Sequence, residues 1–201
     1  MASFDEFLGL YTEEFLPAYS DLVGYLADKP DKVPEQIEAI FSHIMASFTA
    51  KAGGEGIVAQ QNLDRAYIHL IRLVLDCRKI LWALINKNID QIYKDDLKRK
   101  LTTNMPEYEF IEKHHRFKES AIEARRLEMQ QIGKDDINVI RKYREACELG
   151  LDLLGKCDPD KVQAFDLYHI KNLLKMHGIG LLVGGIIGGV LATIVCRALG
   201  I

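Results

Sequence analysis

The sequence predicts an all-α protein, a helical bundle of about six helices with a C-terminal transmembrane helix. Apolar residues recur at helical spacing along most of the chain, and no segment alternates as a half-buried strand would. Near the C-terminus, residues 178–196 carry no formal charge. We therefore expect a soluble bundle over residues 1–157. Residues 158–201 should form a helix that continues into the transmembrane segment at about 176–196.

The first expected helix begins after Ser3. Ser3 and Glu6 have the spacing of a capping box, in which each side chain satisfies a backbone N–H group of the other residue. Apolar residues then recur at helical spacing toward Tyr25. Pro17 lies inside this stretch and has no backbone N–H group, so the sequence predicts an irregularity there.

The next three helices are read from their apolar patterns and from their boundaries. Pro34 suits the first position of the second helix, which ends in the glycine-rich run 52–56. A long third helix is expected over 57–87 and a fourth over 89–101. The boundary between the third and fourth is placed at the polar residues 86–88, because asparagine favours helix ends and turns.

The last helices follow the same logic. Pro106 opens a strongly charged fifth helix, and Gly133 closes it. The charged run 112–118 within it, with its two adjacent histidines, is interpreted as a solvated face. A sixth helix ends near Leu154, and Pro159 starts a seventh that runs on into the apolar tail.

Composition limits the classes of function. The chain has 26 Lys and Arg against 29 Asp and Glu, a net charge of −3, so nucleic acid is not an expected partner. The four cysteines are scattered without a C-x-x-C pair, and neither a metal nor a cofactor is expected. No P-loop, G-x-S-x-G or H-E-x-x-H motif is present, so an enzymatic role is not favoured. The N-terminus is acidic where a signal peptide is basic, which favours a cytoplasmic bundle.

The uncharged segment near the C-terminus has the length of a membrane span. Its nineteen residues, 178–196, would cover roughly 28 Å as a helix, about one hydrocarbon core. Lys171 and Lys175 precede it and only Arg197 follows, which favours the bundle on the cytoplasmic side. The lipid bilayer is therefore an expected partner, with the chain single-pass or tail-anchored. The alternative is a helix buried in the bundle core.

Small residues form two rows along this segment. Spaced about every four residues, such rows leave a flat helix face on which a second helix can approach closely in lipid. We therefore expect a homo-oligomer assembled through the tail, although glycine-rich membrane helices also occur without a partner. The residues predicted to make this contact are Gly180, Gly184, Gly185, Gly188, Gly189 and Ala192.

The third expected helix carries a polar stripe. At a spacing of three and four residues, its members fall within an arc of about 100 degrees. One interpretation is a solvated face or an internal salt-bridge ladder; the other is a pocket for a phosphate, a nucleotide or a small anionic regulator. The stripe consists of Asn62, Arg65, His69, Arg72, Asp76 and Lys79.

A catalytic version of this stripe is the main rival to a binding role. His69 would act as acid or base, and Arg65 or Arg72 would hold the developing charge on a scissile phosphate. The protein would then be a membrane-tethered RNase or nucleotide-binding protein. Helical nucleases built on a dimeric four-helix bundle place Arg and His farther apart than the three residues that separate Arg65 from His69. This spacing counts against the nuclease.

The stretch from Asn62 to Trp82, joined to a small helical body and a hydrophobic segment, resembles small membrane-associated helical proteins of prokaryotic anti-phage defence, including accessory proteins of RNA-targeting CRISPR systems. The resemblance implies an effector whose bundle senses a signal and whose tail assembles in the membrane. We expect a membrane-anchored, oligomeric effector or signalling protein, non-enzymatic and membrane-perturbing in antiviral defence. Its bundle would bind a protein or small anionic regulator. A passive tail-anchored scaffold is the remaining alternative.

Overall fold

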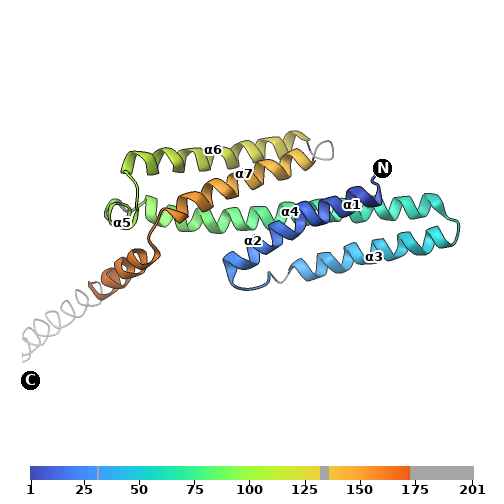
Figure 1. Cartoon of the computed structure of the whole chain (residues 1–201), viewed down its shortest axis with the longest axis horizontal. Coiled ribbons are helices and arrows are strands. Elements are labelled where there is room, and N and C mark those ends of the chain that lie inside the picture. Colours follow the sequence, from blue (N-terminus) through green and yellow to red (C-terminus); the bar gives the residue numbers. More distant parts are fainter. Residues whose placement is uncertain (31, 132–135, 173–201) are drawn as a thin grey trace, which may run out of the picture.

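A computed structural model describes residues 1–30, 32–131 and 136–172. Over these ranges the chain is helical, with the α-helices α1 to α7, one π-helical turn and a further helical segment at 159–172. The described residues contain no β-strand beyond one bridge between Thr103 and Cys157. The all-α prediction is confirmed. Figure 1 shows that one long helix, α4, is shared by two groups of helices. The N-terminal helices lie along one half of α4, and α6 with α7 lie along the other.

The N-terminal segment forms one nearly continuous helical path. Helix α1 covers Phe4–Leu10, a π-helical turn covers Tyr11–Phe15, and α2 covers Leu16–Leu26. The predicted capping box is present, since the Ser3 hydroxyl accepts a hydrogen bond from the Glu6 amide at 3.1 Å and the Ser3 amide donates to the Glu6 carboxylate at 2.7 Å. The π-helical turn falls just before Pro17, where the sequence predicts an irregularity.

Helix α4 is longer than predicted. It runs over Gly56–Tyr93, 38 residues, or roughly 57 Å of helix. The predicted boundary at residues 86–88 is wrong, and the predicted fourth helix over 89–101 is wrong in its first part. Helix α5 covers only Asp96–Thr102, and Asp95 caps its N-terminus.

Tertiary contacts explain why α4 does not end at the asparagines. Ile85 and Ile89 are fully buried and continue the apolar row across this point. The polar residues between them face outward and reach other helices. Asn86 accepts a hydrogen bond from Lys118 of α6, and Asn88 donates one to the Tyr25 hydroxyl of α2 at 2.6 Å. These side chains stabilise the helix that their local preference would end.

Helix α3 covers Lys32–Ala52 and packs along the N-terminal half of α4. Helices α6, Glu107–Gln131, and α7, Asp136–Gly155, pack on each other, and α7 also packs on α4. Gly150 of α7 lies where the three helices meet, next to Ile85 and the Phe117 ring. The absence of a side chain at this position allows the close approach.

Helix α5 carries two buried cations, Arg99 and Lys98, which connect it to neighbouring segments. The guanidinium of Arg99 donates to Asp96 at 2.5 Å, to Glu107 at 2.6 Å and to the Tyr93 carbonyl at 2.5 Å. It therefore joins the end of α4 to the start of α6. The neighbouring Lys98 is also buried and pairs with Asp166 at 2.7 Å.

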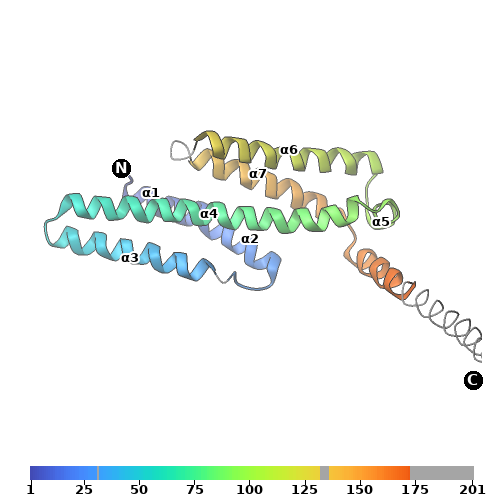
Figure 2. The same ribbon diagram turned by 180° about the vertical axis from the view of Figure 1, so that it is seen from behind.

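Asp166 belongs to a further helical segment, residues 159–172, which follows α7. Figures 1 and 2 show that this segment leaves the end of the bundle and points away from it. Most of its side chains are exposed, including Leu167, Tyr168 and Ile170.

Within the described ranges, no helix combines the length and the apolar character that a membrane crossing requires. The predicted span at 176–196 lies outside the described residues. The predicted oligomerisation residues lie outside them as well, namely Gly180, Gly184, Gly185, Gly188, Gly189 and Ala192.

Candidate functional site

The N-terminal part of the predicted polar stripe, from Asn62 to His69, faces α3. The Asn62 amide oxygen lies 3.3 Å from Nδ1 of His43, a residue of α3. The His43 ring in turn stacks on the His69 ring, with centroids 5.3 Å apart and an angle of 20° between the planes. Sequence reasoning missed His43. It could have been found from its place on α3 beside Ile40 and Ser47, which face α4.

The C-terminal part of the stripe, Asp76 and Lys79, contacts three different helices. The Asp76 carboxylate accepts a hydrogen bond from Gln36 of α3 at 3.4 Å. The Lys79 ammonium pairs with Glu128 of α6 at 2.5 Å and lies 5.6 Å from the centre of the Tyr143 ring of α7. The stripe therefore connects α4 to its neighbours, and its polar groups are directed to separate points along the helix.

The two arginines of the stripe differ from the other members. Arg65 and Arg72 are exposed, and neither has a hydrogen-bond or ion-pair partner within the described part of the chain. The pKa of His69 is lowered, first by its partial burial and then by the nearby His43 and Arg72. A neutral His69 beside two exposed arginines forms a surface that can attract an anion.

His114 does not lie on a solvated face as predicted for residues 112–118. It is only 6% exposed, its ring stacks on Tyr93 with centroids 3.9 Å apart, and Nε2 lies 3.4 Å from the Asp90 carboxylate. Its neighbour His115 is exposed. Because the charges of the run are balanced, the sequence does not show which of the two adjacent histidines faces the core. Contacts with Tyr93 and Asp90 of α4 show that it is His114.

His114 should make the stability of the protein depend on pH. Burial lowers its pKa, an effect that outweighs the hydrogen bond to Asp90, which raises it. Its stabilising contribution is therefore complete above the unfolded value of about 6.5 and is lost as the pH falls through the lower folded value. We expect the free energy of unfolding, measured by urea titration, to decrease as the pH falls from about 6.5 through the folded pKa of His114.

His114→Gln should reduce this pH dependence, and His115→Gln, on the exposed neighbour, should leave it unchanged. The remaining slope of the His114→Gln variant should reflect His69, whose pKa is also lowered. The carboxylates with lowered pKa values, such as Asp90, respond below about pH 4 and fall outside the window. An equal slope in both variants would contradict this assignment.

The described ranges contain no group of three or more His, Cys, Asp and Glu side chains that could hold a metal ion. Burial raises the pKa of Cys77 to about 11 and that of Cys147 to about 12, so both thiols remain protonated near neutral pH.

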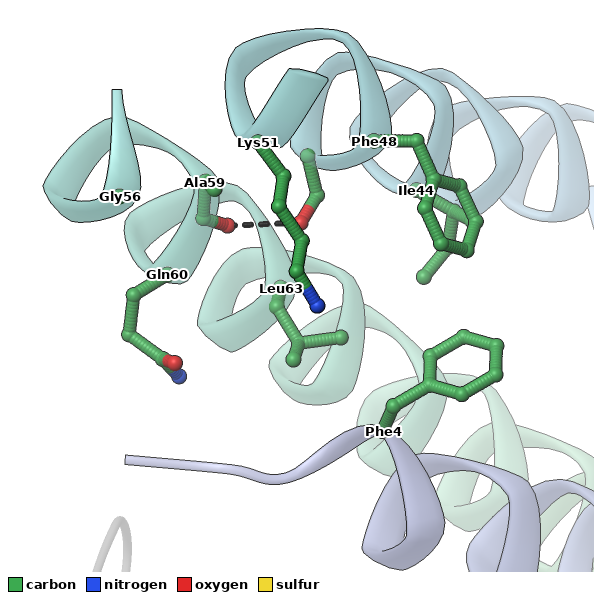
Figure 3. A pocket seen from close by; sticks show the side chains of 9 residues that line it. Phe4, Ile44, Phe48, Lys51, Gly56, Ala59, Gln60 and Leu63 are labelled. Atoms are coloured by element: carbon green, nitrogen blue, oxygen red, sulfur yellow. Dashed lines mark hydrogen bonds between the residues drawn. The ribbon is translucent and has the colours of Figure 1, made fainter. Parts of the chain in front are cut away.

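An apolar groove runs between α1 and α3, with α4 as its floor. It consists of two hollows of about 280 Å³ and 250 Å³, which share Phe4 and Ile44 in their walls. Figure 3 shows the first hollow, with Phe4 of α1 facing Phe48 of α3 and Lys51 extending from α3 beside them. The Phe4 and Phe48 rings make an edge-to-face contact, with centroids 5.6 Å apart.

Large apolar side chains border this groove and remain exposed. We call this surface the α1–α3 face. Its members are between 40% and 62% exposed, although they adjoin a core in which comparable residues are fully buried. The largest exposed apolar patch of a soluble protein is often a functional surface. The α1–α3 face consists of Phe4, Leu8, Phe41 and Phe48, which line the two hollows, and of the exposed Met45, which lies one helical turn from Phe41 on α3.

Comparison with protein-family models, with curated proteins and with solved structures finds no match to this chain. The candidate surfaces are therefore judged by their own geometry. The polar stripe is largely engaged in contacts between helices, and the α1–α3 face is an apolar surface without a partner in the described part of the chain.

Proposed function

We propose that the protein is a membrane-tethered, homo-oligomeric helical effector or signalling protein that acts by binding rather than by catalysis. The observation that carries the proposal is the helical segment 159–172. It leaves the bundle with apolar side chains exposed. In the sequence, the uncharged residues 178–196 follow this segment after five further residues. This arrangement suits a stalk between a bundle in water and a tail in lipid.

The α1–α3 face supports the oligomeric part of the proposal, with a second copy of the chain as its partner. Its five exposed side chains offer roughly 500 Å² of apolar surface, judged from the size of aromatic residues. A stable interface between free proteins needs about 800 Å² per partner. Tethering to a bilayer raises the effective concentration of the partner, so a smaller surface suffices. A two-fold arrangement would bring the same face of both copies together.

The defence setting of the proposal rests on the resemblance of the Asn62–Trp82 stretch to membrane-associated anti-phage proteins. In this setting, assembly of the tails would perturb the bilayer. The rival RNase would act through Arg65, His69 and Arg72, and His69→Ala would then abolish phosphodiester cleavage by the pure protein. We expect no cleavage that depends on His69, because its ring is stacked on the His43 ring of α3.

Membrane attachment is tested by flotation of cell membranes that carry the full chain. Lysine at both Ile186 and Ile187 should move the protein from the floating fraction to the soluble one, since each lysine at the centre of a span costs about 2.5–3.5 kcal/mol. Leu167→Lys is the matched control, because Leu167 is exposed on the segment before the span. Flotation of the double variant at the wild-type level would contradict the tether.

A tail exchange separates an active tail from a passive scaffold. Residues 176–201 are replaced by an unrelated tail anchor, so that the chain still floats with membranes. We expect the exchanged chain to lose membrane leakage in cells while it keeps its location. Leakage equal to that of the wild type would show that the tail only localises the bundle.

A further inference from the structure

Another hollow, which we call the α4–α6 pocket, lies in the C-terminal half of the bundle. Its volume is about 510 Å³, within the range of pockets that hold small organic ligands. Helix α7 contributes one aromatic ring to its wall. The lining residues are Lys79, Trp82, Ala83, Lys118, Ala121, Ile122, Arg125, Arg126 and Tyr143.

The packing of the helices explains why this hollow exists. Helices α4 and α6 both pack closely on α7 and less closely on each other. Large side chains bridge the space between them, as in the contact of the Trp82 and Phe117 rings, whose centroids are 5.7 Å apart. Where the small residues Ala83 and Ala121 line the two helices, no described side chain fills the space.

The charges around the pocket are unequal. Glu128 pairs with both Lys79 and Arg125, and these partners, with Tyr143, lower its pKa despite the opposing effect of burial. Asp90 pairs with Lys118 at 3.0 Å. Arg126 has no hydrogen-bond or ion-pair partner in the described ranges. Two carboxylates thus pair with three of the four cations that line the pocket, and Arg126 remains for the anionic end of a ligand.

The walls between these charges are apolar. The aliphatic stems of long cationic side chains can line a hollow while their charged ends reach water. Ile122 is 50% exposed here and lacks a covering group among the described residues. The indole N–H of Trp82 is buried and has no acceptor among the described residues.

We propose that the α4–α6 pocket binds an organic anion, a molecule with an apolar body and a phosphate or carboxylate end. The body lies against Trp82, Ala121 and Ile122, and the anionic end lies near Arg126. The site shares no lining residue with the groove of the α1–α3 face. The inference therefore goes beyond the proposed function and stands independently of membrane attachment.

Trp82 is the single tryptophan of the chain, so indole fluorescence reports this pocket directly. The full chain in uncharged detergent is titrated with adenosine monophosphate, as a soluble source of the anion, and with dodecyl phosphate, as a lipid-like source. Adenosine and dodecanol are the matched uncharged probes. We expect a saturable change with one of the phosphates, and a weaker one or none with its uncharged counterpart.

Two variants and a control locate the binding. Arg126→Gln should weaken binding by about tenfold or more, as expected for the loss of a charge-assisted hydrogen bond. Ala83→Leu should fill the hollow and prevent saturation. Arg116→Gln, on an exposed arginine of α6 outside the pocket, should bind as the wild type does. No saturable change with either phosphate, or equal affinities in all three variants, would overturn the proposal.

Discussion

Placing a side chain at Gly150 should strongly destabilise the bundle. A Cβ atom there would lie 2.5 Å from Cγ2 of Ile85 and 2.6 Å from Cε2 of Phe117, both buried and held by their neighbours. Overpacking of this kind costs about 1–3 kcal/mol for a small addition, more than the gain of about 1 kcal/mol in helix propensity. Gly150→Leu should exceed the effect of Gly150→Ala and leave little folded protein.

The measurement is urea unfolding followed by circular dichroism, with Gly24→Ala as the matched control. Gly24 also lies inside a helix, α2, but no described atom outside that helix lies within 4 Å of where its Cβ would be. Alanine there should raise the free energy of unfolding by about 0.5–1 kcal/mol. The same substitution should therefore have opposite signs at the two glycines. A stabilising Gly150→Ala would contradict the close packing of α4, α6 and α7.

The fold class and most helix starts follow from local chemistry. The Ser3–Glu6 capping box, the irregularity near Pro17 and the glycine-rich turn after α3 each depend on residues close in sequence. The end of α4 depends on contacts with residues far along the chain. Lys118 and Tyr25 hold Asn86 and Asn88 in the helix, and no local pattern announces either partner.

For the candidate site, too, the sequence predicts what lies on one helix and does not predict contacts between helices. The six residues of the polar stripe lie on one helix, α4, as expected, and regular helical geometry predicts that they share one side of it. Spacing could not show that His43 would stack on His69, or that Lys79 would pair with Glu128. The α1–α3 face was also missed, because exposed and buried apolar residues look alike in sequence until the packing of α1 and α3 is known.

The second large effect is expected in the tail. Gly184 and Gly188 lie one helical turn apart in the predicted span, and isoleucine at both would block close approach of another helix. Isoleucine keeps the segment apolar, so the chain should remain in the membrane while its tails separate. Phe41→Ser with Met45→Ser addresses the α1–α3 face in the same way and should weaken the oligomer further.

The most direct test of a tail-assembled oligomer is the mass of the detergent-purified full chain by light scattering. The wild type is measured beside the Gly184→Ile, Gly188→Ile variant under identical conditions. We expect a defined oligomer for the wild type and a shift toward the monomer mass of 22.8 kDa for the variant. A monomer in both samples would contradict the account and leave the tail as a simple anchor.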